Sequence, residues 1–83
     1  MLVIKEEKYP IKVGVEVFNV EYPSFEEAQE IAKEFKGLGG EEAIAKMKAW
    51  LIKLGLDEKF FSLKAIKAKH IMLIWQEINS VKK

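Results

Sequence analysis

Few side chains in this 83-residue chain are of the types that perform chemistry, and their spacing forms no catalytic or metal-binding motif. His70 is the one histidine and cysteine is absent, so the sequence offers neither a thiolate nucleophile nor a Cys/His metal site. Ser24, Ser62 and Ser80 have no base that a sequence motif would place beside them. We therefore predict a protein that is not an enzyme, with no catalytic residue, cofactor or metal, and a His70 that is structural or on the surface.

Two further patterns resemble chemical motifs but have simpler interpretations. The paired carboxylates Glu26-Glu27 and Glu41-Glu42 each open a predicted helix, where the helix dipole favours acidic side chains. Gly39-Gly40 has neither the spacing of a Walker A loop nor that of a G-x-G-x-x-G turn. We interpret this glycine pair as a hinge between two helices.

The elements that would position these residues indicate one α+β domain over residues 1–83. Apolar runs at residues 2–4 and 11–20 flank a polar loop that ends in Pro10, which predicts an antiparallel β-hairpin over residues 2–20. Within the second run the apolar positions change phase after Val17. A phase change exchanges the two faces of a strand, so we expect a bulge or bend near residues 17–19, with Gly14 as the alternative position.

After the hairpin, the spacing of apolar residues predicts three helices, of which the last is the longest. Their ranges are about residues 24–36, 41–54 and 58–81. Ser24 and Glu27 fit a capping box at the start of the first helix, and Gly37 suits its end. In the third helix Lys67 falls within the apolar face. Either its methylenes extend along the core, or it marks a break between a short turn near residues 57–63 and the helix proper.

Four apolar side chains are candidates for a partner-binding surface. Met72 and Leu73 lie outside the main apolar stripe of the last helix, and Trp75 flanks that stripe. Trp50, on the preceding helix, is expected to meet the same core as Trp75, and a Trp in so small a core is often only partly buried. Two interpretations remain open: these side chains are core and its margin, or they form a contact surface.

Charge is distributed unevenly although the net charge is only +1. Residues 1–43 hold five Lys and ten Glu, a net of −5, whereas residues 44–83 hold nine Lys and three acids, a net of +6. Such halves either drive head-to-tail association into a homo-oligomer or offset each other within one molecule. The basic residues are all Lys, and the absence of Arg counts against sequence-specific nucleic-acid recognition. No apolar run approaches a membrane span, so we expect a cytoplasmic protein without membrane contact.

Taken together, the segments resemble the small tail assembly chaperones of bacteriophages. The similarity is one of layout and covers most of the chain: residues 8–18, residues 22–28, residues 50–63 and the helix that ends at residues 81–83. The resemblance implies a non-enzymatic protein that binds the long, helical tape-measure protein while tail subunits polymerise around it. Met72 would suit such a surface, because Met side chains adapt to varied partners.

Two other functions remain alternatives to this expectation. One is a small nucleic-acid-binding regulator, favoured by the Lys-rich second half of the chain and opposed by the missing Arg. The other is a phage-encoded protein-interaction or inhibitor domain. Salt-sensitive DNA binding would indicate the first, and co-purification of a host protein would indicate the second.

Overall fold

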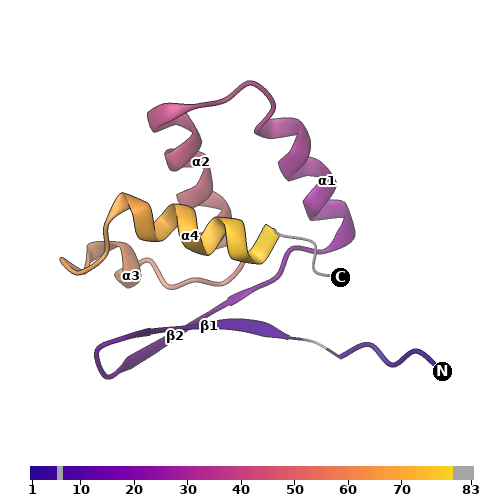
Figure 1. Ribbon diagram of the computed structural model, residues 1–83, viewed down its shortest axis with the longest axis horizontal. Coiled ribbons are helices and arrows are strands. Elements are labelled where there is room, and N and C mark those ends of the chain that lie inside the picture. Colours follow the sequence, from indigo (N-terminus) through magenta and orange to yellow (C-terminus); the bar gives the residue numbers. More distant parts are fainter. Residues whose placement is uncertain (6, 80–83) are drawn as a thin grey trace.

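The computed structural model describes residues 1–5 and 7–79 and consists of a two-stranded antiparallel sheet followed by helices. In chain order the elements are β1 (Lys8–Val13), β2 (Glu16–Glu21), α1 (Phe25–Glu34), α2 (Gly40–Lys53), α3 (Lys59–Ser62) and α4 (Ala68–Asn79). Figure 1 shows the hairpin lying below the helices, with α4 between the hairpin and the α1–α2 pair. The α+β class, with an N-terminal antiparallel hairpin followed by helices, is confirmed. Within the described residues no helix is long and apolar enough to cross a membrane.

The hairpin forms from the second apolar run alone, which folds back on itself. Val13 pairs with Glu16, so Gly14 and Val15 make a two-residue turn. Gly14 has a φ of 61°, and a positive φ at the first of two turn positions is the requirement of a type II′ hairpin. The predicted pairing with residues 2–4 is wrong, because residues 1–5 have no regular secondary structure and the strands span residues 8–21. A short, tight reversal at a glycine forms more readily than a pairing across a longer loop.

The same turn explains the change of phase in the apolar pattern. Across the hairpin, odd-numbered residues of β1 pair with even-numbered residues of β2, as Ile11 does with Phe18 and Tyr9 with Val20. Odd positions before the turn and even positions after it therefore share the face that packs on the helices. The discontinuity lies at Gly14, the alternative position, and not at residues 17–19.

Local signals at α1 act as expected. Glu27 N–H donates to Ser24 Oγ at 3.1 Å, and Ser24 N–H donates back to Glu27 Oε1 at 2.9 Å, which confirms the capping box. Gly37 follows the helix with a φ of 80°, a conformation that glycine adopts without the steric cost of a Cβ. The boundaries of α1 are therefore determined by sequence-local interactions.

The predicted helix over residues 58–81 is interrupted, as the second interpretation of Lys67 allowed. α3 ends at Ser62, Leu63 has extended backbone with ψ 133°, and α4 begins only at Ala68. Lys67 N–H donates to His70 Nδ1 at 2.9 Å, so a side chain three residues on satisfies the amide at the helix start. The described part of α4 has 12 residues and α2 has 14, while positions 80 and 81 lie outside the described residues.

Apolar side chains from the hairpin, α2, α3 and α4 form one core cluster. Phe60 on α3 lies within it with no exposed surface, and its ring meets Phe18 of β2 edge to face at 5.2 Å. Glu21 N–H also donates to Leu54 C=O at 2.9 Å, which joins the end of β2 to the end of α2. A lone hairpin is only marginally stable in water, so these contacts are what hold β1 and β2 in place.

Candidate functional site

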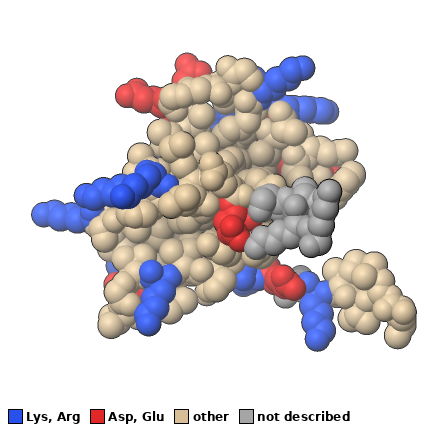
Figure 2. All heavy atoms as spheres, in the orientation of Figure 1, with Lys and Arg blue, Asp and Glu red and all other residues tan. Residues whose placement is uncertain are grey.

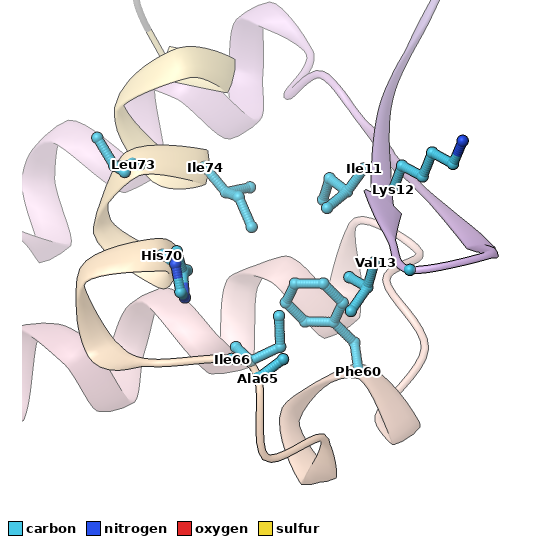
Figure 3. A pocket seen from close by; sticks show the side chains of 10 residues that line it. Ile11, Lys12, Val13, Phe60, Ala65, Ile66, His70, Leu73 and Ile74 are labelled. Carbon is cyan, nitrogen blue, oxygen red and sulfur yellow. The ribbon is translucent and has the colours of Figure 1, made fainter.

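An apolar groove lies between the turn end of the hairpin and the first half of α4. Its volume is about 410 Å³. Figure 3 shows Ile74 of α4 and Ile11 of β1 pointing toward each other across it, with Phe60 lying between the two elements. The larger apolar side chains that line it are Ile11, Val13, Phe60, Ile66, Leu73 and Ile74.

The geometry of α4 determines how Leu73 meets this groove. Ile71, Ile74 and Ile78 follow a three- and four-residue spacing and are buried, which fixes the face that α4 turns to the core. Leu73 lies one residue before Ile74, about 100° around the helix, and so stands at the margin of that face. Its side chain lines the groove and is 60 % exposed, so apolar surface remains uncovered at the groove's edge.

The structure divides the four residues proposed for partner contact. Trp50 and Trp75 are 5 % and 8 % exposed, so of the two interpretations left open these two side chains fit that of core residues. Met72 is exposed but does not line the groove, whereas Leu73 does both. Of the four, therefore, Leu73 is the residue that joins an exposed apolar side chain to a concave apolar surface.

Both tryptophans are held by specific contacts with α1 and the segment that follows it. Trp50 Nε1–H donates to Glu34 Oε1 at 3.2 Å, and the Trp75 ring lies 4.9 Å from that of Phe35. Lys46 Nζ also donates to Glu34 Oε1, at 3.1 Å. The hydrogen bond from Lys46 lowers the pKa of Glu34 below its usual range, and that from Trp50 adds a smaller effect in the same direction. These contacts attach α1 to α2. The burial of Trp50 is therefore explained by its role in packing the fold.

Charge at the groove is modest. Lys12 of β1 is the one lysine among the described residues that line it, and residues 57–77 carry four Lys against Asp57, Glu58 and Glu77, a net of +1. Lys59 has a partner, since its Nζ lies 3.4 Å from Glu16 Oε2. Figure 2 shows lysine side chains projecting where α3 and the start of α4 lie. An apolar floor with one lysine at its edge favours a ligand that presents an apolar face.

His70 lines the groove but already has a structural task. Its Nδ1 accepts the Lys67 N–H at the start of α4, so this nitrogen carries no proton in the arrangement described. The expectation of a structural histidine agrees with this contact. Among residues 1–5 and 7–79, no group of three His, Cys, Asp or Glu side chains is placed to hold a metal ion.

Sequence reasoning missed two exposed apolar features. Leu2, Val3 and Ile4, expected in a strand, are 64 to 84 % exposed. Phe25, an apolar residue within the predicted first helix, is 79 % exposed at the first position of α1. No local signal distinguishes these residues from core residues, because periodicity reports which face is apolar and not whether another element covers it.

Comparison of the chain with models of protein families, with curated proteins and with solved structures found no match. The proposed function is therefore based on the chemical properties of the groove. The groove is apolar, concave and open at Leu73, with Lys12 at its edge.

Proposed function

We propose that the protein is a non-enzymatic assembly chaperone that holds an amphipathic helix of a client protein in the groove between the hairpin and α4. The observation that carries the proposal is the uncovered Leu73 side chain at the edge of an open apolar groove. A helix that lays its apolar face into such a groove is a recurring mode of peptide recognition. The resemblance to phage tail assembly chaperones makes the tape-measure protein the client, with tail subunits as further partners.

The size of the site fits a chaperone that must release its client. A groove of about 410 Å³ receives a few side chains, so each contact is expected to be weak. Several copies bound along one long helical client gain avidity that no single contact supplies. Weak individual contacts also allow the copies to be displaced as tail subunits assemble.

The experiment is co-expression of the protein with the tape-measure protein, with soluble client and co-purification as readouts. Leu73→Lys places a charge at the edge of the groove and is expected to lower client binding at least about tenfold, because burial of most of a Leu side chain is lost. Met72→Lys is the matched control: it is the same change at the neighbouring exposed position of α4, which does not line the groove. Circular dichroism establishes that both variants remain folded.

Three results would contradict the proposal. Client solubility that is equal for Leu73→Lys and the parent protein would remove the groove from the mechanism. Tight, steeply salt-dependent DNA binding by the pure protein would favour the nucleic-acid-binding regulator instead. Co-purification of a host protein in place of the tape-measure protein would favour the inhibitor alternative.

A further inference from the structure

We infer that α1 is a detachable cover: it opens as a unit about two hinge segments, residues 22–24 and 37–40, and thereby exposes Trp50 and Trp75. The arrangement in Figure 1 is the closed state, with α1 packed beside α2 and on the other side of α4 from the hairpin. The inference does not depend on a phage client or on the groove, so it goes beyond the proposed function. It rests on how little of α1 is buried, on where its contacts lie and on the chain at its two ends.

Burial distinguishes α1 from the helices of the core. Ile31 is the one buried side chain among the ten described residues of α1, whereas α4 buries four. Phe25, Ala28 and Ala32 are apolar residues of α1 that stay exposed. Because stabilisation by burial scales with the apolar area removed from water, α1 is held less firmly than α4. Segments with few buried apolar contacts open at a lower free energy than the core around them.

Specific contacts attach α1 at its C-terminal end. Glu34 accepts hydrogen bonds from Lys46 Nζ at 3.1 Å and from Trp50 Nε1 at 3.2 Å, and the ring of Phe35, the C-cap residue, lies 4.9 Å from that of Trp75. The side chains of Lys46 and Glu34 are 44 % and 39 % exposed, so water competes for both charged groups. Ion pairs with this exposure contribute little to stability. These contacts orient α1 in the closed state but do not hold it there strongly.

The chain on either side of α1 can change direction. Glu21 N–H donates to Leu54 C=O at 2.9 Å, which fixes the end of β2 to the end of α2 and confines movement before α1 to residues 22–24. After α1, Gly37 and Gly40 have φ values of 80° and 59°. Glycine has no Cβ and so reaches many other backbone conformations from these values. A few such residues are enough to form a hinge.

Opening changes both α1 and the surface beneath it. A ten-residue helix is too short to be stable alone in water, so α1 is expected to unfold in the same step as it detaches. Trp50 and Trp75 lose the cover that Glu34 and Phe35 provide. A helix that replaces α1 on the two indoles must offer apolar side chains four residues apart, as Ile31 and Phe35 do. Access to this surface is therefore controlled by the opening of α1.

The test is hydrogen exchange of the pure, folded protein, followed by NMR at several low urea concentrations. The relevant amides extend from Ala28, whose N–H donates to Ser24 C=O, to Phe35, whose N–H donates to Ile31 C=O. After correction for intrinsic rates, we expect them to exchange at least about tenfold faster than the slowest amides of α2 and α4, and with a shallower dependence on urea, because opening exposes little surface. Trp50 Nε1–H should exchange in the same step, since its acceptor is Glu34.

Two substitutions distinguish local opening from global unfolding. Phe60 is fully buried away from α1 on α3, so Phe60→Leu destabilises the closed and open states alike. It should accelerate the slowest amides of α4 about five- to thirtyfold and leave those of α1 unchanged. Glu34→Gln weakens a contact of the closed state alone and should accelerate the α1 amides about two- to fivefold. Glu30→Gln, the same change at another exposed position of α1, should not accelerate them.

Three results would overturn the inference. If Phe60→Leu accelerates the α1 and α4 amides by the same factor, α1 opens only when the whole protein unfolds. If Trp50 Nε1–H exchanges with the slowest amides of α2, opening of α1 does not expose that indole. If Glu34→Gln leaves the exchange of α1 unchanged, the contact with Lys46 does not hold the helix closed.

Discussion

Three Phe→Ala substitutions, at a buried, a half-buried and an exposed position, test the core packing beneath the groove. Phe60 is fully buried and meets Phe18 and Phe61 edge to face at 5.2 and 5.5 Å. A Phe side chain buries about 150–250 Å², worth about 4–6 kcal/mol at 25 cal/mol/Å², and Phe→Ala changes in cores cost about 3–5 kcal/mol. An 83-residue domain has a total stability of about 4–12 kcal/mol, so Phe60→Ala should remove at least about a quarter of it.

The other two positions serve as matched controls in urea unfolding followed by tryptophan fluorescence. Phe61 is half-buried, so Phe61→Ala should cost about 1–2 kcal/mol, whereas Phe25 is 79 % exposed and Phe25→Ala should cost less than about 1 kcal/mol. If Phe60→Ala is unfolded without urea, Phe60→Leu supplies a milder change of about 1–2 kcal/mol at the same position. A cost for Phe25→Ala equal to that for Phe60→Ala would refute the placement of α1 and of the core.

Two further predictions concern the ends of helices. Ser24→Ala should cost about 1 kcal/mol at pH 7 through loss of the cap on α1. The Ser24 N–H holds the pKa of Glu27 below its usual range, so the contribution of the Glu27 carboxylate is present above its unfolded pKa of about 4.3 and is lost as the pH falls through the lower folded value. Glu27→Gln should therefore be less stable than the parent protein at pH 7, and the difference should shrink as the pH falls below about 4. A difference that does not change with pH would contradict this part of the cap. Gly39 is the N-cap of α2 and has extended backbone with a φ of −153°, whereas Gly40, the first residue of the helix, has a φ of 59°. Gly39→Ser should therefore stabilise the protein by about 0.5 kcal/mol, and Gly40→Ser should destabilise it by about 1 kcal/mol, in thermal unfolding. Effects of the same sign would show that this turn is wrongly described.

Local signals predicted the helix boundaries better than the pairing of strands. The capping box at Ser24 and the glycine at position 37 act within a few residues, so the sequence alone located α1 closely. The hairpin was placed over residues 2–20 because two apolar runs flanked a loop. That pattern does not show that the second run reverses at Gly14. A bulge in a single strand and a two-residue turn between two strands change the phase of the apolar positions in the same way.

The candidate site was predicted only in part for a related reason. Periodicity placed Leu73 at the margin of the apolar face, and the structure exposes it there. Periodicity could not show that Trp50 would be buried, because its indole N–H is satisfied by Glu34, which approaches from a separate helix, α1. The groove likewise joins β1 to α4, a juxtaposition of residues some sixty positions apart that a linear pattern does not encode.

The break before α4 and the groove have one physical origin. Had residues 58–81 formed a single helix, its side chains would have run along the hairpin without interruption. Instead the chain leaves helical geometry at Leu63, and Ile66 N–H donates to Leu63 C=O in the turn that follows. Ile66 thereby lines the groove from outside any helix, and Lys67 and His70 start α4 in a new direction. The position of Lys67 within an apolar face thus marks the interruption at which Ile66 joins the lining of the groove.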